Sequence, residues 1–337
     1  MERQEPATQL IARPPEPNEP ELSLTMYRTM LLSRVLDARM LALNRQGRVP
    51  FVVQCQGHEA AQVGMVSALR RGQDFFLLYY RDLAAALAIG VTPREVMLGV
   101  FARADDPSCG GRQMPEHFSD RRLRIFTGSS CVGTQIPHAA GIALAANIRG
   151  ETDVACVSFG EGATSKGDFH EGVNFAAVHR LPVIFFCQNN GYAISERVDR
   201  QMAVRSVADR ATAYGIPGVS VDGNDAIAVL HATREAAERA RAGDGPTLIE
   251  ARTYRLAPHT SDDDDRAYRS REEVDDWRRR DPIDRMRRYL EEQSLLDSAA
   301  DEALRREVAE AVDDATRFAE QAAPPDPATL GRHVYAE

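Results

Sequence analysis

The chain has 337 residues, of which 43% are hydrophobic and 27% are charged, and its formal net charge is −9 at pH 7. This composition is typical of a globular protein and lacks the basic character of a nucleic-acid binder. No run approaches the roughly 20 apolar residues of a membrane-spanning helix. Neither nucleic acid nor a membrane is therefore an expected partner.

The first 20 residues contain five prolines and no apolar stretch typical of a secretory signal. We expect an extended or disordered arm over residues 1–20. The five cysteines include no C-x-x-C pair, which disfavours a zinc site or a disulfide framework: Cys55, Cys109, Cys131, Cys156 and Cys187. Cys156 and Cys187 lie in apolar runs and are expected in the core. A reducing cytoplasm is the expected location.

Patterns of helix and strand follow in chain order. Apolar residues at helical spacing predict helices over 26–43, 57–69, 82–89, 134–147 and 169–178. Runs that are apolar on both faces predict buried strands over 153–159, 181–187 and 247–255. Residues 103–122 are expected to form a long ordered loop. From residue 272 to 321 the pattern is charged and helical. We therefore predict one α/β domain over 21–321, with a mostly parallel central sheet flanked by helices, a C-terminal helical extension and a tail over 322–337.

Polar residues follow two of the predicted strands. The first strand ends in Gly160-Glu161-Gly162 and the second in Asn189-Asn190. The segment 153–190 forms a strand–helix–strand unit, whose two strands are parallel and end at the same edge of the sheet. Glu161 and Asn190 are therefore expected to be neighbours at the edge where open α/β sheets bind ligands.

A carboxylate, a carboxamide and glycines at one edge fit a metal-bound diphosphate. Mg²⁺ prefers oxygen ligands and often completes its shell with phosphate, and Gly160 and Gly162 allow the backbone to approach a diphosphate. A P-loop is excluded because Asp168 stands where that loop needs lysine, and a dinucleotide fingerprint is excluded because Ser165 stands where it needs glycine. A simple Asn-Gly turn is the alternative explanation of the second motif.

The order GEG, helix, NN resembles the thiamin-diphosphate motif. GEGATSKGDFHEGVNFAA together with FFCQNNGYAIS is similar to the α subunits of the E1 component of 2-oxo acid dehydrogenase complexes, over about residues 25–320. This resemblance implies a thiamin-diphosphate-binding fold with thiamin diphosphate and Mg²⁺ as cofactors. It also implies Mg²⁺ ligands in Glu161, the Asn190 side chain and the Tyr192 carbonyl, and a diphosphate lined by Gly160, Gly162 and Ala163.

Further positions are implied by the same resemblance. Tyr80-Arg81 resembles the family's aromatic-arginine pair, in which the guanidinium clamps the diphosphate. SSCVGTQIP resembles the loop in which Ser130 and the Val132 backbone touch the cofactor. Four residues match a monovalent-cation site of some members, which makes K⁺ a further candidate ligand, with a helix cap as the alternative: Ser129, Cys131, Thr134 and Gln135.

His259 is the predicted catalytic and cofactor-binding histidine. It lies in APHTSDDDDRAYRS, which resembles the family's mobile active-site loop. A neutral imidazole there could bind phosphate or hydrogen-bond the reacting carbonyl group. The other histidines are expected to be surface or capping residues: His58, His117, His138, His170, His179, His231 and His333.

Two residues depart from the family's pattern. Gln188 stands where some relatives carry a basic residue, so one phosphate contact is expected to be missing or replaced. Thr260 follows the loop histidine where the animal enzymes carry a regulatory serine, which argues against kinase control at this position.

GGRQMPEHF, residues 110–118, resembles the branched-chain type of the family. This implies oxidative decarboxylation of 2-oxo acids such as 2-oxoisovalerate and reductive acyl transfer to lipoyl groups. Pyruvate and acetoin dehydrogenases are alternatives within the family. A non-catalytic nucleotide-binding module is an alternative of another class, but it would not need Glu161, Asn190 and the His259 loop together.

No second run of buried strands follows residue 255, although thiamin enzymes need a second module that holds the aminopyrimidine. We therefore expect an E1 β subunit as partner in an α₂β₂ assembly, docked on the lipoyl acyltransferase (E2) core.

Overall fold

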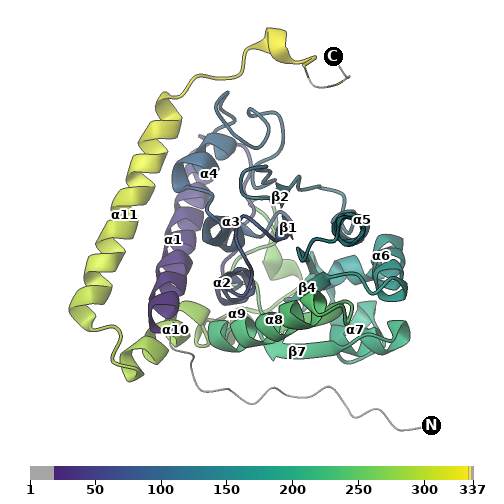
Figure 1. Cartoon of the computed structure of the whole chain (residues 1–337). Helices are drawn as coiled ribbons and strands as arrows, with labels where there is room; N and C mark the ends of the chain where they lie inside the picture. The colour runs from purple at the N-terminus through teal and green to yellow at the C-terminus, as the bar shows by residue number, and fades with distance from the viewer. Residues whose placement is uncertain (1–18, 333, 335–337) are drawn as a thin grey trace.

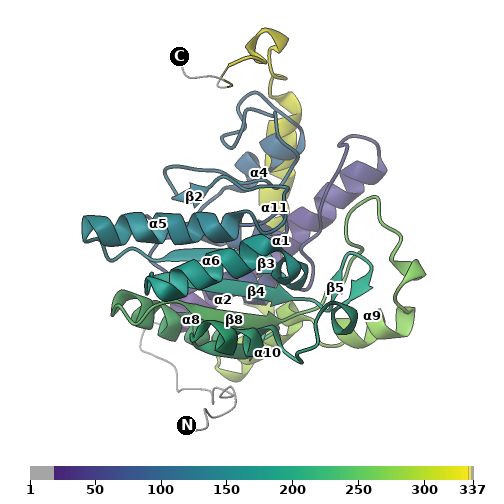
Figure 2. The same cartoon turned by 90° about the vertical axis from the view of Figure 1, so that its right-hand side faces the viewer.

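The computed structural model describes residues 19–332 and 334, and its centre is a six-stranded parallel sheet between layers of helices (Figures 1 and 2). The strand order is β2-β1-β3-β4-β8-β7. The strands are β1 (Phe75–Leu77), β2 (Ile125–Phe126), β3 (Ala155–Gly160), β4 (Val183–Asn189), β7 (Gly218–Asp222) and β8 (Thr247–Arg252). The predicted α/β class with a parallel sheet is confirmed.

The two central strands are apolar on both faces because both faces are covered. On one face, Phe185 and Val157 belong to the same core as side chains of α5 (Gln135–Arg149) and α6 (Gly167–Val178). On the other, Phe186 and Ile184 belong to the core of α2 (Glu59–Ser67), α3 (Leu83–Ile89) and α8 (Ala226–Arg241). Burial on both sides fixes β3 and β4 at the centre of the sheet.

Long helices close one side of the molecule. Helix α1 (Glu19–Arg45) packs against α2 and against α11 (Ser298–Gln321), which also contacts α4 (Pro93–Val100) (Figure 1). The predicted helical region 272–321 consists of α9 (Arg271–Arg278), α10 (Pro282–Glu292) and α11. Asp281 and Asp297 begin the last two helices, and their side chains accept hydrogen bonds from backbone N–H groups of the first turn. Among the described residues, no helix is long and apolar enough to cross a membrane.

The chain termini differ in part from the prediction. Helix α1 already begins at Glu19, so the last two residues of the predicted arm are helical, and residues 1–18 lie outside the described part. Pro20 is tolerated because the first helical turn needs no N–H donor at that position. In the predicted tail, Arg112 donates to the Oγ1 atom and the carbonyl of Thr329, next to a short 3₁₀ turn (Pro327–Thr329).

Several short or partly exposed elements are absent from the prediction: β1, β2, α4, β7, α8 and the small hairpin β5 (Tyr192–Ala193) and β6 (Glu196–Arg197) with α7 (Val198–Gln201). Strand β1 covers only three residues of the short apolar run 75–78, and β7 is a half-buried edge strand without a long apolar run. The predicted loop over 103–122 is confirmed, since it contains no helix or strand.

Candidate active site

The carboxyl ends of β3 and β4 bring the two sequence motifs together. The strands pair in parallel up to Gly160, which lies opposite Gln188. One residue beyond, Glu161 begins a 3₁₀ turn (Glu161–Ser165), and its Oε2 atom accepts a 3.1 Å hydrogen bond from the backbone N–H of Asn190. Both side chains are buried. The expected neighbourhood of Glu161 and Asn190 is therefore present.

A cavity of about 620 Å³ opens at this edge of the sheet. Thirteen of the predicted site residues line it: Tyr80, Arg81, Ser129, Ser130, Val132, Gln135, Gly160, Glu161, Gly162, Ala163, Asn190, Tyr192 and His259. Two of the predicted cation ligands do not. Thr134 lines a neighbouring groove together with Ser129 and Ser130, and the Cys131 side chain is exposed.

The group at the strand ends is suited to a divalent cation. Burial raises the pKa of Glu161, and a bound cation would offset this penalty on the carboxylate. Asn190 Oδ1 accepts from the N–H of Tyr192 at 3.2 Å, and the Tyr192 carbonyl accepts a long 3.5 Å contact from Arg255. One carboxylate, one amide and one carbonyl form an oxygen set for Mg²⁺ that would need water or phosphate to complete it.

No other kind of metal centre competes with this set in the described part of the chain. Within residues 19–332 and 334, no three His, Cys, Asp or Glu side chains gather in a way that could hold a metal ion. The cysteines are all free, and Cys55, Cys156 and Cys187 are buried.

Two buried arginines make the opposite wall electropositive. Arg81 and Arg255 are each about 2% exposed or less. Their guanidinium groups donate to backbone carbonyls, Arg81 to Gln54 at 2.6 Å and Arg255 to Ile194 at 2.7 Å. Among the described residues, neither is ion-paired with a carboxylate. Because a buried charge without a counter-ion costs free energy, this wall favours an anion such as a diphosphate.

His259 lies between these two arginines. Its Nδ1 atom is 3.2 Å from Nη2 of Arg81 and 2.9 Å from Nη1 of Arg255. A guanidinium can only donate, so Nδ1 must be the acceptor and the neutral ring carries its proton on Nε2. Burial, with Arg81 and Arg255, lowers the pKa of His259 to about 3. The imidazole is therefore a neutral donor at physiological pH.

Arg255, which the sequence analysis does not single out, ties the histidine loop to the metal end of the cavity. It donates to the Tyr192 carbonyl and, at 3.2 Å, to the hydroxyl of Tyr268. Asp263 accepts from the N–H of His259 at 2.7 Å and also from the Tyr268 hydroxyl. The place of Arg255 shortly after strand β8, the third strand end at this edge, is the signal that could have identified this arginine from the sequence.

His58 was wrongly assigned to the surface or to a helix cap. His58 is fully buried; it precedes α2 but makes no capping bond, and its Nε2 atom is 3.3 Å from Nδ2 of Asn190. His117 lines the cavity and is 2.6 Å from the hydroxyl of Ser130. His138, His170 and His179 are exposed, His231 is half-buried beside Glu19, and His333 lies outside the described residues.

Gln188 does not face the cavity. It is fully buried, and its amide donates to Oδ1 of Asp82 at 2.6 Å and accepts from Gln62 at 3.1 Å. The side chain therefore belongs to a polar network within the core. The prediction that one phosphate contact is missing or replaced remains a prediction.

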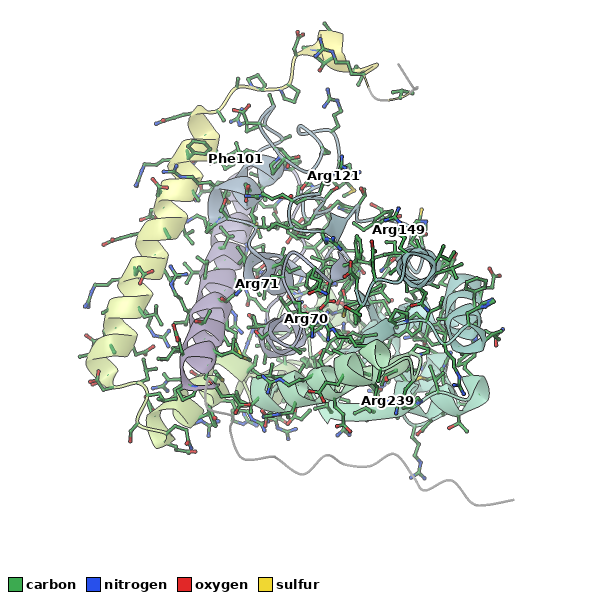
Figure 3. All side chains as sticks on the ribbon, viewed as in Figure 1. Arg70, Arg71, Phe101, Arg121, Arg149 and Arg239 are labelled. Carbon is green, nitrogen blue, oxygen red and sulfur yellow. The ribbon has the colours of Figure 1, made fainter. Side chains whose placement is uncertain are left out.

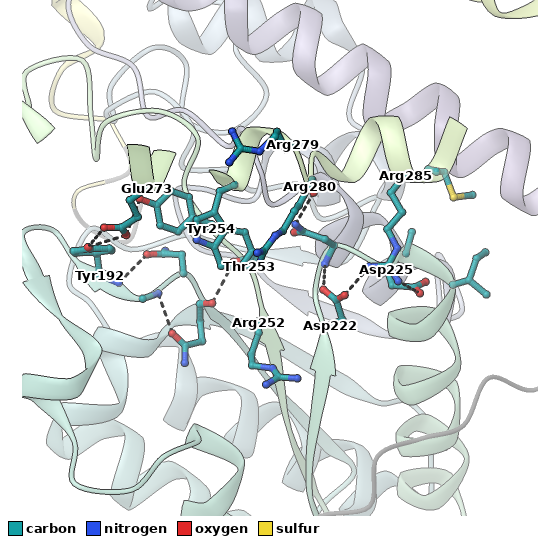
Figure 4. A pocket seen from close by; sticks show the side chains of 18 of the residues that line it. Tyr192, Asp222, Asp225, Arg252, Thr253, Tyr254, Glu273, Arg279, Arg280 and Arg285 are labelled. Atoms are coloured by element: carbon teal, nitrogen blue, oxygen red, sulfur yellow. Dashed lines mark hydrogen bonds and ion pairs between the residues drawn. The ribbon is translucent and has the colours of Figure 1, made fainter. Parts of the chain in front are cut away.

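A larger cavity of about 1040 Å³ lies between the ends of β7 and β8 and helices α9 and α10 (Figure 4). Some of its charged groups have partners within the cavity: Arg285 contacts both Asp222 and Asp225, and the hydroxyls of Tyr192 and Tyr254 donate to Glu273 (Figure 4). The contact between Tyr192 and Glu273 supports the metal-binding end of the smaller cavity. We assign the chemistry to that smaller cavity.

Comparison with known proteins defines the class. A model of the dehydrogenase E1 component family matches residues 27–328, so the chain belongs to this family. The chain is 52% identical over 315 residues to the 2-oxoisovalerate dehydrogenase subunit alpha of Bacillus subtilis, covering 94% of this chain and 96% of the relative. It is 44% identical over 306 residues to the 3-methyl-2-oxobutanoate dehydrogenase subunit alpha of Mycobacterium tuberculosis, covering 87% and 79%. It is 42% identical over 276 residues to the pyruvate dehydrogenase E1 component subunit alpha of Staphylococcus aureus, covering 82% and 72%. The resemblance found in the motifs is confirmed.

Proposed function

We propose that this chain is the α subunit of a thiamin-diphosphate-dependent E1 that oxidatively decarboxylates branched-chain 2-oxo acids and passes the acyl group to lipoyl groups of E2. The observation that carries the proposal is the contact between Glu161 and Asn190 at the end of β3 and β4, facing the Arg81–His259 wall across one cavity. A nucleotide-binding module would have no need of this combination.

Each element of the site has a part in this function. Thiamin diphosphate, when bound, supplies the nucleophilic carbon that adds to the 2-oxo group and accepts the electrons left when CO₂ departs. Glu161, Asn190 and the Tyr192 carbonyl would hold Mg²⁺. Arg81 and the turn from Gly160 to Ala163 would hold the diphosphate. Nε2–H of His259 would donate a hydrogen bond to a phosphate oxygen or to the oxygen of the reacting carbonyl.

A monovalent cation is a further proposal. The Gln135 carboxamide donates to the carbonyl of Ser158, while its buried Oε1 atom has no hydrogen-bond partner among the described residues. An acceptor oxygen in this state suits a K⁺ ligand. Ser129, Cys131 and Thr134 would complete the site through the loop that carries them. A cytoplasmic location also remains a prediction.

The branched-chain substrate rests on the relatives. The two with the higher identity are named for 2-oxoisovalerate and for 3-methyl-2-oxobutanoate, which are names of one compound. The cavity has apolar walls for an aliphatic chain, including Phe51, Val53 and Phe159. The relative named for pyruvate is less similar, at 42% identity, and pyruvate is therefore the second candidate substrate.

A β subunit is the proposed partner in an α₂β₂ assembly. After β8 the described chain forms only helices and turns, so it offers no second sheet for the aminopyrimidine side of the cofactor. The mouth of the cavity carries exposed apolar side chains, Met114 (48% exposed), Val132 (44%) and Ile194 (55%). Apolar groups of this kind favour a covering protein. Docking on an E2 core is part of the same proposal.

A binding experiment tests the cofactor assignment. Thermal unfolding of the chain, alone and with its β subunit, is measured with thiamin diphosphate, ATP or NAD, with and without Mg²⁺. We expect a stabilisation that needs both thiamin diphosphate and Mg²⁺. A response to ATP or NAD alone would favour the nucleotide-binding module.

A further inference from the structure

Position 166 carries the only lysine of the chain. The sequence contains 41 Lys and Arg residues, and with this one lysine the remaining 40 (41 − 1) are arginines. Exposed arginines such as Arg70, Arg71, Arg121 and Arg149, which are labelled in Figure 3, do not line the active-site cavity. Lys166, in contrast, lines that cavity. The one lysine ammonium group of this chain is therefore placed at its candidate active site.

The backbone holds Lys166 in place while its ammonium stays available. The residue follows the 3₁₀ turn Glu161–Ser165, and its N–H donates to the carbonyl of Ala163 at 3.0 Å. Its Cβ and Cγ atoms lie beside Gly133, next to Val132. The side chain is exposed. Among residues 19–332 and 334, its ammonium makes no hydrogen bond or ion pair.

The other cationic side chains of the cavity already donate hydrogen bonds to groups of the protein. Arg81 donates to Gln54 and His259, and Arg255 donates to Tyr192 and Ile194, and both arginines are buried. They form one connected group with the metal end through Asn190 and Glu161. Lys166 lies against the loop at Val132 instead. An anion that enters the cavity beside that loop meets Lys166 as its free cation.

We propose that Lys166 binds the carboxylate of the incoming 2-oxo acid, an inference that rests on the function proposed above. An ammonium on a flexible stem is a point charge, in contrast to the fixed fork of arginine, and it can follow a small ligand. Because the carboxylate is still present when the 2-oxo group is attacked, this ion pair stabilises the bound substrate and that transition state alike. Lys166 is therefore a binding residue that acts on KM and leaves kcat nearly unchanged.

A chemical test uses the uniqueness of this lysine. The complex of the chain with its β subunit is treated with an amine-acetylating reagent, and acetylation of the Lys166 peptide is followed by mass spectrometry, with the α-amino group of Met1 as internal reference. We expect 2-oxoisovalerate to slow acetylation of Lys166 about fivefold or more at saturation, and an uncharged ketone of the same shape to leave it unchanged.

The outcomes of the acetylation test show which binding partner protects Lys166: the 2-oxo acid, the cofactor or the β subunit. Protection by thiamin diphosphate with Mg²⁺, and none by the 2-oxo acid, would assign Lys166 to the cofactor and overturn the proposal. Protection by the β subunit alone, whatever ligand is added, would make Lys166 an interface residue and overturn it as well.

Kinetics of the complex give an independent readout. Lys166→Gln should raise KM for 2-oxoisovalerate about fivefold or more with kcat within twofold, and Lys166→Arg should recover most of the loss. Arg149→Gln, which removes an exposed charge outside the cavity, is the matched control. An unchanged KM in Lys166→Gln contradicts the inference. A wild-type complex without turnover contradicts the proposed function. The acetylation test would still measure whether the 2-oxo acid binds to Lys166, because that test needs no catalysis.

Discussion

The backbone N–H of Asn190 donates a 3.1 Å hydrogen bond to the Glu161 carboxylate, although 29 residues (190 − 161) separate the two in the chain. The contact exists because β3 and β4 are parallel neighbours whose carboxyl ends lie at one edge of the sheet. Glu161 is buried there, and burial raises its pKa. A carboxylate kept under this penalty at a ligand edge is the feature that a bound cation would explain.

Glu161→Gln keeps the shape of the side chain and an acceptor for Asn190, but removes the only carboxylate of the proposed Mg²⁺ set. We expect affinity for thiamin diphosphate with Mg²⁺ to fall by about a hundredfold, or roughly 2.7 kcal/mol, while the ligand-free protein is no less stable, since a neutral group is easier to bury. Titration calorimetry with the complex measures this. Glu171→Gln, on the exposed side of α6, is the control. Unchanged cofactor binding in Glu161→Gln would show that the metal assignment is wrong.

His259→Ala removes the neutral donor from between Arg81 and Arg255. We expect the fold to persist and acyl transfer to a lipoyl acceptor to fall by about 10²-fold or more. The pKa of His259 is lowered to about 3, and binding of an anionic diphosphate should raise it.

NMR of a ring-labelled histidine in the complex checks this second point. Without cofactor the His259 signal should not titrate between pH 5 and 8, and with cofactor its midpoint should move upward. Titration near the ordinary histidine value in the ligand-free state, or near-normal acyl transfer in His259→Ala, would contradict the role given to this residue.

Asp37 in α1 is a fully buried carboxyl group whose pKa is raised to about 7, first by burial and then by Glu59. A folded-state pKa above the unfolded value means that ionisation opposes folding, so this group costs stability increasingly from about pH 4 to about pH 7 and fully above it. Asp37→Asn should therefore gain stability relative to wild type by roughly 1.4 kcal/mol for each pH unit in that window.

Urea unfolding at several pH values measures the difference. Asp105→Asn, an exposed carboxylate, is the control and should show no such trend. A stability difference between Asp37→Asn and wild type that does not vary between pH 4 and 7 would mean that Asp37 titrates as an ordinary carboxyl group.

The central fold could be predicted because its strands are long and apolar. Strands β3 and β4 correspond to the strands predicted over 153–159 and 181–187, and α11 ends at Gln321 as predicted. Strand β1 covers only three residues of the short apolar run 75–78, and β7, at the half-exposed sheet edge, carries no such run. Their places depend on pairing with β3 and β8, which is tertiary information.

The site residues also fall into two groups, those that the sequence indicates and those that only the fold brings together. Glu161 and Asn190 stand at strand ends within a recognisable motif, and Arg81 and His259 stand in segments that resemble the family. His58 and His117 carry no local pattern, since a lone histidine looks the same in the sequence whether it lies on the surface or in a buried site, and the only signal for Arg255 is its place shortly after strand β8. Their roles come from segments that the fold brings together, such as the 3.3 Å approach of His58 to Asn190.

Gly160 and Gly162 form a matched pair for locating the diphosphate. A Cβ atom added at Gly160 would meet no atom within 4 Å, whereas one at Gly162 would lie 2.8 Å from Cβ of Ala193. We therefore expect Gly160→Ala to fold with stability within about 0.5 kcal/mol of wild type but to bind thiamin diphosphate weakly, because its methyl group occupies the space that the diphosphate needs.

Gly162→Ala should instead lower stability itself, because the turn and β5 must move apart. Thermal unfolding with and without thiamin diphosphate and Mg²⁺ separates the two effects. Normal cofactor binding by Gly160→Ala would place the diphosphate elsewhere in the cavity.

The central claim is that this chain is one half of a thiamin-diphosphate-dependent E1 for branched-chain 2-oxo acids. The most direct measurement is CO₂ release from 2-oxoisovalerate, with thiamin diphosphate and Mg²⁺, by the chain purified alone and by the chain co-purified with its β subunit. The account predicts release by the complex, faster than from pyruvate, and none by the chain alone. Full activity of the chain alone, or a complex that binds thiamin diphosphate but releases no CO₂ from any 2-oxo acid, would contradict it.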